Sequence, residues 1–298
     1  MKRTALRSHG WLLALGALTA CAGQTSQTPE TAATSTVEAA APDFDPAPPP
    51  TDSVRVLFIG NSYTYVNELP KQIVRLAASA DAARPMFVNQ VTPGGATLER
   101  NWNDGRARRL IRLGGWTHVV LQEQSARPID DPETFLEYAR LFDREIDRVG
   151  AETVLYLTWA REHRPASQDT LTAAYRAVAA ELGATVAPVG VAWTEALAED
   201  PDLELHHEDR SHPGPLGSYL AASVFYATLY GATPEGLAAV PLTTLDVPDS
   251  EHAPSVYAPR PGRDGEAITG PTASLLQRVA WAVVGREATP EPTPPRSR

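Results

Sequence analysis

Two short stretches, far apart along the chain, hold side chains whose types and spacing suit acyl-transfer chemistry. Ser62 follows the apolar run "VRVLFI" (54–59), and "DRSH" places Asp209 three positions before His212. On a turn, a carboxylate at this spacing can accept a hydrogen bond from one ring nitrogen of the histidine, and the other nitrogen can then face a serine. The three residues therefore fit the roles of nucleophile, general base and orienting group.

Each of these residues also has a simpler interpretation. Asn61 and Ser62 are turn formers that commonly cap a following helix, and Asp209 could act as a cap as well. A metal site is a further alternative for the cluster formed by His206, His207, Glu208, Asp209 and His212. The spacing of this cluster matches no standard metal site, and the chain contains no His-Glu-x-x-His stretch. We therefore predict that the protein uses no metal and no other cofactor.

The elements that must position these residues alternate regularly along the chain. Strand-like apolar runs occupy 54–59, 86–91, 117–122, 153–158 and 184–189. Helix-like stretches occupy 68–82, 97–113, 132–149, 168–183, 214–230 and 272–285. Apolar strands separated by helices of this length are typical of a parallel sheet that is covered on both faces. We predict an α/β fold: a three-layer α/β/α sandwich with a central, mostly parallel five-stranded sheet, of the flavodoxin-like type.

Polar and glycine-rich stretches follow the first three predicted strands. They are "GNSYT" after the first, "TPGGAT" after the second and "QEQS" after the third. In parallel sheets the reactive groups collect outside the carboxyl ends of the strands. These stretches would therefore bring a serine, backbone N–H groups and amide side chains to one edge of the sheet, where they could stabilise a developing oxyanion.

Three of these motifs resemble the blocks of SGNH (GDSL-type) hydrolases. "FIGNSYT" is similar to the serine block, in the subgroup that reads GNS, and "DRSH" to the Asp-x-x-His near the C-terminus. The resemblance implies that Ser62 is the nucleophile and an oxyanion donor through its backbone N–H, with Asp209 orienting His212 as the base. "TPGGAT" resembles the glycine block, which implies that Gly94 or Gly95 gives a second N–H donor.

The chain departs from this family pattern at the third block. The usual Gly-x-Asn-Asp is absent, and "VVLQEQS" stands at that strand end. Either Gln122 or Gln124 could supply the side-chain N–H that the family's asparagine gives, and Gln122 is our first choice because it stands directly at the strand end. Thr64 breaks the G-x-S-x-G pattern, which argues against a lipase of the α/β-hydrolase fold.

The N-terminal segment predicts export. Residues 1–20 have a basic start and a short apolar stretch, as in a signal peptide, and "LTAC" resembles the lipobox of bacterial lipoproteins. We predict that Cys21, the chain's single cysteine, is lipidated and holds the protein to the outer membrane or cell surface. From 21 to 52 the composition predicts a disordered tether, followed by an SGNH hydrolase-like domain (53–287) and a disordered tail (288–298).

Charge and motifs together restrict the function. The net charge of -10 would become -13 after loss of the basic signal peptide, and an acidic body disfavours binding to nucleic acid. We expect an exported serine esterase that hydrolyses small acyl esters, acetyl above all, on carbohydrate. The alternatives are a glycan- or wall-binding lipoprotein without turnover and a lipid-directed esterase or thioesterase.

Overall fold

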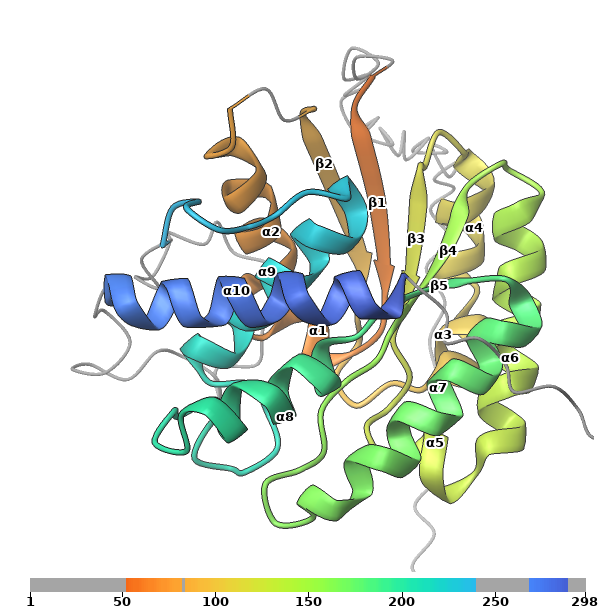
Figure 1. Cartoon of the computed structure of the whole chain (residues 1–298). Coiled ribbons are helices and arrows are strands. Elements are labelled where there is room, and N and C mark those ends of the chain that lie inside the picture. The colour runs from red at the N-terminus through yellow and green to blue at the C-terminus, as the bar shows by residue number, and fades with distance from the viewer. Residues whose placement is uncertain (1–51, 82–83, 240–267, 289–298) are drawn as a thin grey trace, which may run out of the picture. The chain divides into compact units, whose positions relative to one another are not determined.

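A five-stranded, entirely parallel sheet forms the centre of the protein, with the strand order β2-β1-β3-β4-β5 (Figure 1). The computed structural model describes residues 52–81, 84–239 and 268–288. The strands are β1 (Val54–Ile59), β2 (Met86–Val91), β3 (His118–Leu121), β4 (Glu152–Tyr156) and β5 (Thr185–Ala187). The predicted α/β architecture with a five-stranded sheet is confirmed.

The alternation of side chains along β1 explains why both faces of the sheet are covered. Val54, Val56 and Phe58 point into one apolar core, whereas Leu57 and Ile59 point into the other. All five side chains are fully buried. A strand without a polar face requires helices on both sides, so the apolar run of β1 is the sequence feature that produces three layers.

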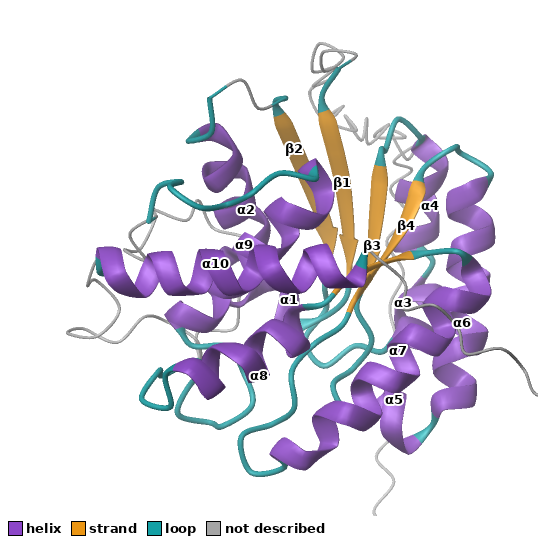
Figure 2. Cartoon of the chain, viewed as in Figure 1, coloured by secondary structure: helices purple, strands orange, loops and turns teal. Residues whose placement is uncertain are grey.

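Helices cover the two faces in separate groups (Figure 2). The core on one face is built with α2 (Leu69–Ala78), α8 (Val189–Glu199), α9 (Pro215–Tyr230) and α10 (Gly270–Glu287). The core on the other contains side chains of α3 (Leu98–Asp104), α4 (Arg106–Leu113), α6 (Pro132–Asp147) and α7 (Gln168–Leu182). Among these, α9 is the most deeply buried and packs between α2 and α10.

Short elements at the carboxyl ends of the strands make the connections. They are α1 (Ser62–Tyr65), the 3-10 turn η1 (Val66–Glu68), α5 (Arg127–Asp130) and the 3-10 turn η2 (Pro165–Ser167). The predicted helix 97–113 is two helices, α3 and α4, because Gly105 adopts a left-handed conformation (φ 74°) between them. α8 was not predicted at all.

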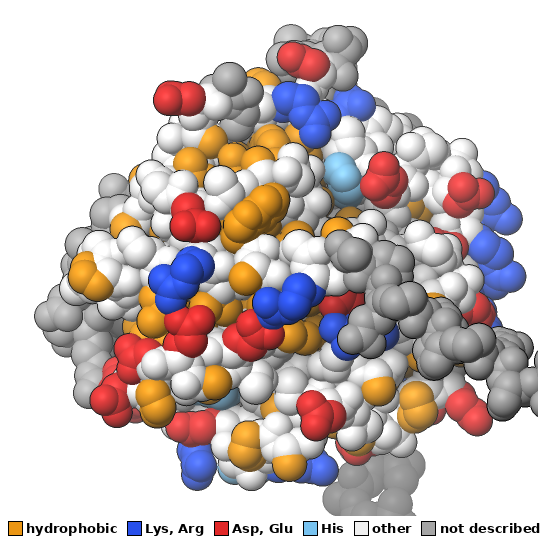
Figure 3. Space-filling view, viewed as in Figure 1, with side chains coloured by type: hydrophobic (Ala, Val, Ile, Leu, Met, Phe, Trp, Pro, Cys, Tyr) orange, Lys and Arg blue, Asp and Glu red, His pale blue; other side chains and the backbone are white. Residues whose placement is uncertain are grey.

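Charged side chains of both signs are interspersed on the face that carries α8 and α10 (Figure 3). Ion pairs join these two helices there, between Arg278 and Glu199 and between Arg286 and Glu195. In the part of the chain that the structure describes, no helix combines the length and apolarity needed to cross a membrane.

Several predictions lie outside the described residues. These concern the signal peptide, Cys21, nearly all of the tether up to 52 and the tail after 288. The long surface excursion that turn-forming residues suggest between 233 and 270 also falls mostly on undescribed residues. The domain bounds of 53–287 stay a prediction.

Candidate active site

Ser62 lies at a sharp turn between β1 and α1. Asn61 caps α1, since its side-chain oxygen accepts the Tyr63 N–H at 3.0 Å, and its Nδ2 donates to the Ala96 carbonyl at 2.8 Å. Ser62 is the first residue of the helix, where backbone N–H groups have no intrahelical acceptor. None of the described residues accepts a hydrogen bond from this N–H. The turn thus leaves both the hydroxyl and the N–H of Ser62 available.

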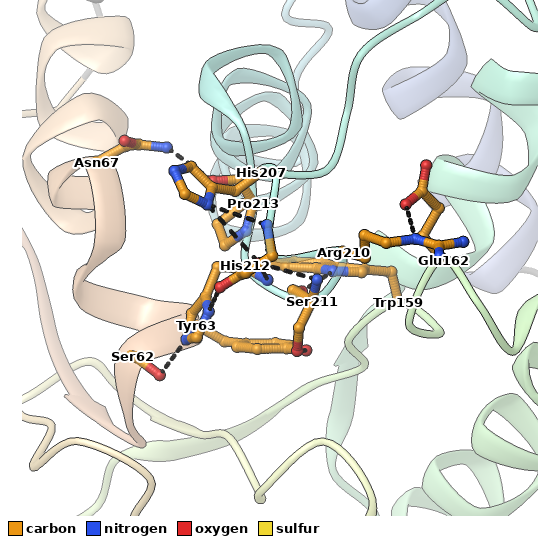
Figure 4. Close-up of polar contacts among 11 residues, drawn as sticks. Ser62, Tyr63, Asn67, Trp159, Glu162, His207, Arg210, Ser211, His212 and Pro213 are labelled. Atoms are coloured by element: carbon orange, nitrogen blue, oxygen red, sulfur yellow. Dashed lines mark hydrogen bonds and ion pairs between the residues drawn. The ribbon is translucent and has the colours of Figure 1, made fainter. Parts of the chain in front are cut away.

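The histidine of "DRSH", His212, lies directly against this serine (Figure 4). Nε2 of His212 is 2.8 Å from Ser62 Oγ, and Nδ1 is 2.5 Å from Asp209 Oδ2. The second carboxylate oxygen, Oδ1, accepts the backbone N–H groups of Ser211 and His212 at 3.0 and 2.9 Å. Asp209 therefore fixes both the ring and the turn that carries it. We call residues 206–213 the base loop.

The surroundings of Asp209 favour its ionised form. Partial burial raises the pKa of this carboxyl group, but hydrogen bonds from the His212 ring and from the backbone N–H groups of His212 and Ser211 outweigh burial and hold the pKa below its usual value. An ionised carboxylate at Nδ1 stabilises a positively charged imidazole ring. This is the charge that the ring acquires when it takes a proton from a serine.

Gln122 has a different place from the one predicted. Its side chain is fully buried, with Oε1 accepting from the Asn61 N–H at 2.9 Å and the Thr64 hydroxyl at 3.0 Å. Its Nε2 donates to the Glu123 carbonyl at 2.7 Å. A Cβ on Gly60 would lie 2.5 Å from Oε1, which explains the glycine before the serine turn. Gln122 thus holds the serine turn and its Nε2 is already bonded to a carbonyl, so Gln124 replaces it as our first choice for the amide donor.

Gln124 and the two glycines remain candidate oxyanion donors. The side-chain oxygen of Gln124 accepts the N–H groups of Ala126 and Arg127, and no described residue accepts from its Nε2. Gly94 and Gly95 are exposed, and their N–H groups have no acceptor within the described ranges. Gly95 has a φ of 64°, a conformation that favours glycine.

Glu123 is a buried carboxyl group that the sequence did not single out. It accepts the N–H of Leu98, at the start of α3, at 3.2 Å and that of Gln124 at 2.6 Å. Burial raises the pKa of this group to about 7, although these two hydrogen bonds and the charge of Arg127 act in the opposite direction. Glu123 thus joins the loop after β2 to the loop after β3, which carry the candidate donors.

A stack of aromatic rings packs against the base loop. The rings of Tyr63 and Trp159 stack at a centroid distance of 4.8 Å, and Trp159 stacks in turn on Trp193 at 4.1 Å. The indole N–H of Trp159 donates to the Ser211 carbonyl at 3.0 Å. The side chain of Trp159 is fully buried. Its role is to support the base loop.

Another histidine of the cluster, His206, makes a separate contact. Nε2 of His206 pairs with the Ala160 carbonyl at 3.1 Å, and burial lowers the pKa of this ring. Among the residues with described positions, no three histidine, cysteine, aspartate or glutamate side chains are arranged to hold a metal ion. A cavity of about 720 Å³ lies beside the base loop, where Arg161, His206 and Arg210 line it and Ser62 does not.

Comparisons with known proteins place this geometry in a structural context. No family model and no curated protein matches the chain. Among solved structures, a proposed SGNH hydrolase from Slackia heliotrinireducens is 29% identical, with a TM-score of 0.50 over 59% of this chain and 98% of the other. The fold is that of SGNH hydrolases. A DUF4886 family protein from Bacteroides uniformis shares this fold at 16% identity, with a TM-score of 0.59 over 78% of this chain and 95% of its own.

A third similar structure is an alpha/beta hydrolase enzyme from the metagenome of Lake Arreo, Spain. It is 16% identical, with a TM-score of 0.51 over 59% of this chain and 94% of its own. On the SGNH fold of our chain, the structure brings Ser62, Asp209 and His212 together and leaves Gln122 behind the serine turn.

Proposed function

We propose that the protein is an exported serine esterase that hydrolyses small acyl esters, acetyl above all, on carbohydrate. The observation that carries this proposal is the hydrogen-bonded chain from Ser62 Oγ through His212 to Asp209, with heavy-atom distances of 2.8 and 2.5 Å. The SGNH fold supports the same reaction class, because the serine occupies the carboxyl end of β1, where ligands bind in such sheets.

The reaction begins at Ser62. His212 Nε2 takes the hydroxyl proton while Ser62 Oγ attacks the ester carbonyl, and Asp209 stabilises the resulting imidazolium. The same proton then passes to the leaving alcohol, which gives an acyl-enzyme. A water molecule, deprotonated by His212, attacks the acyl-enzyme and releases the carboxylic acid and free Ser62.

The negative charge on the carbonyl oxygen requires donors in both steps. The backbone N–H of Ser62 is one, and the N–H of Gly94 or Gly95 is a second. Gln124 Nε2 is the third, in place of Gln122. Ser62 begins α1 directly after β1, and the other candidate donors lie in the loops after β2 and β3, so all of them stand at the carboxyl ends of neighbouring strands.

The choice of substrate rests on charge and location. The acidic body would be repelled by anionic lipid surfaces, and a lipidated Cys21 with its tether would hold the domain among envelope polysaccharides. An acetyl group on such a polysaccharide is a small, neutral acyl group within reach of the tethered domain.

Turnover of p-nitrophenyl acetate tests the reaction directly. We expect Ser62→Ala and His212→Ala each to lower kcat by about 10³–10⁶-fold while the protein stays folded by circular dichroism. A fluorophosphonate label should appear on Ser62 and be absent from Ser62→Ala. A fully active Ser62→Ala variant would overturn the assignment, and an inactive wild-type protein would favour the non-catalytic glycan-binding lipoprotein.

A series of p-nitrophenyl esters from acetyl to decanoyl tests the acyl group, with acetylated xylan fragments as the glycan. We expect kcat/KM to be highest for acetyl and to fall as the chain lengthens. A value that climbs with acyl length would contradict the acetyl preference and favour the lipid-directed esterase or thioesterase.

A further inference from the structure

The segment that carries Ser62 also holds the base loop at two further points. Tyr63 Oη lies 2.6 Å from Ser211 Oγ, and Asn67 Nδ2 donates to the Pro213 carbonyl at 3.1 Å (Figure 4). Ser211 and Pro213 are the neighbours of His212 in the chain. When the contact between His212 and Ser62 is included, three consecutive residues of the base loop, 211–213, are each bonded to the segment 62–67.

The backbone at Asn67 is unusual. Asn67 and Glu68 both have a φ of 53°, in the left-handed region that non-glycine residues seldom adopt. This conformation turns the chain between α1 and α2 and directs the Asn67 side chain to the Pro213 carbonyl and to Ser218 Oγ, at 2.9 Å, on α9. Strained backbone persists where the surrounding structure over-determines it, and it clusters at functional sites.

We propose that Asn67 and Tyr63 are positioning residues for His212. They fix the base loop on both sides of the histidine, so that Nε2 stays within hydrogen-bond distance of Ser62. This proposal rests on the esterase function proposed above, since it assigns these residues to proton transfer. The contacts are made before any substrate binds, so their loss should slow the chemical step and leave substrate affinity nearly unchanged.

The main test uses Asn67→Gly and Asn67→Asp with p-nitrophenyl acetate. Glycine keeps the left-handed backbone without the two hydrogen bonds. Aspartate also tolerates that backbone, but it places an acceptor against the Pro213 carbonyl. We expect kcat to fall by about 10- to 100-fold in Asn67→Gly and further in Asn67→Asp, with KM changed by less than about 3-fold.

Glu68→Gly is the matched control. It changes the adjacent residue, which has the same positive φ, but the Glu68 side chain pairs with Lys71 of α2 and not with the base loop. We expect kcat of Glu68→Gly to stay within about 2-fold of wild type. If Asn67→Gly and Asn67→Asp fold and keep the kcat of this control, the proposal for Asn67 is overturned.

A double-mutant cycle tests Tyr63. Tyr63→Phe keeps the ring that stacks on Trp159, and Ser211→Ala removes the hydroxyl on the other side of the contact. We expect each variant to lower kcat by about 3- to 10-fold and the double variant to lower it no further. Effects that simply multiply would show that Tyr63 does not act through Ser211. An active Ser62→Ala variant would instead refute the esterase function, so the two failures are distinguishable.

Discussion

Amide side chains decide the local structure around Ser62. Gln122 accepts the Asn61 N–H, Asn61 donates to Ala96, and Asn101 donates to the Gly60 carbonyl at 3.0 Å. The turn that exposes the serine is therefore held by polar groups that are themselves almost completely buried. Removing any one of them leaves a buried partner unsatisfied, so this turn should tolerate few substitutions.

Truncation of the two glutamines after β3 should affect mainly stability in one case and mainly turnover in the other. Gln122→Ala leaves the Asn61 N–H without its acceptor, and we expect it to lower the free energy of unfolding by about 1–3 kcal/mol. Gln124→Ala removes a candidate oxyanion donor, and we expect kcat to fall by about 10²–10³-fold. Its side-chain oxygen also accepts the N–H groups of Ala126 and Arg127 at the protein surface, so we expect a smaller loss of unfolding free energy, about 1 kcal/mol. Urea unfolding and ester turnover measure the two effects. A Gln122→Ala protein of normal stability that has lost kcat would restore our original choice.

At the scale of elements, the apolar periodicity of the sequence predicted the sheet and most of the longer helices. The runs 54–59 and 86–91 coincide with β1 and β2, and 132–149 and 168–183 contain α6 and α7. The sequence did not predict α8, because the predicted strand 184–189 ran into its first residue and because Gly190 and Val191 are poor helix formers. Tertiary packing decides this helix: Gly190 lies against the Thr158 carbonyl, where a Cβ would not fit.

The sequence predicted only part of the candidate site, for a similar reason. Spacing alone brings Asp209 and His212 together, and the strand-end rule places Ser62 near them. The side chains that support them make contacts over long sequence distances, such as Tyr63 with Ser211 and Asn67 with Pro213. Such contacts depend on how the loops are folded over the sheet, which no local pattern encodes.

Glu123 links the end of β3 to the start of α3, and this link should depend on pH. The pKa of a glutamate in the unfolded chain is near 4.5, whereas burial raises that of folded Glu123 to about 7. Between these pH values the unfolded state ionises first, so the contribution of Glu123 is fully present below about pH 4.5 and is lost as pH rises to about 7. The loss should be about 3 kcal/mol.

Urea unfolding of wild type and Glu123→Gln between pH 4.5 and 8 measures this contribution, because glutamine resembles the neutral carboxyl and does not titrate. We expect the difference in unfolding free energy between the two proteins to shift against wild type as pH rises and to level off above about pH 7. A difference that is constant across this range would contradict a neutral, buried Glu123.

At the scale of the whole molecule, the proposed location depends on Cys21. We expect the full chain to sediment with membranes and Cys21→Ser to remain soluble, since the variant has no thiol to carry a lipid. Ser62→Ala is the control that should stay membrane-bound. Fractionation and the mass of the mature N-terminus are the measurements. An unmodified N-terminus downstream of Cys21 in the wild-type protein would refute lipidation.

The stack beneath the base loop gives this protein an optical signal of its own. The ring centroids of Trp159 and Trp193 are 4.1 Å apart and the rings are inclined by only 11°, so their electronic excitations are close enough to couple and should contribute to the circular dichroism of the folded protein. The indole N–H of Trp159 is bonded to the Ser211 carbonyl, next to His212 in the chain, so a displacement of His212 should change this contribution. The order of the base loop could therefore be followed by spectroscopy in the resting protein, without a substrate or an added dye.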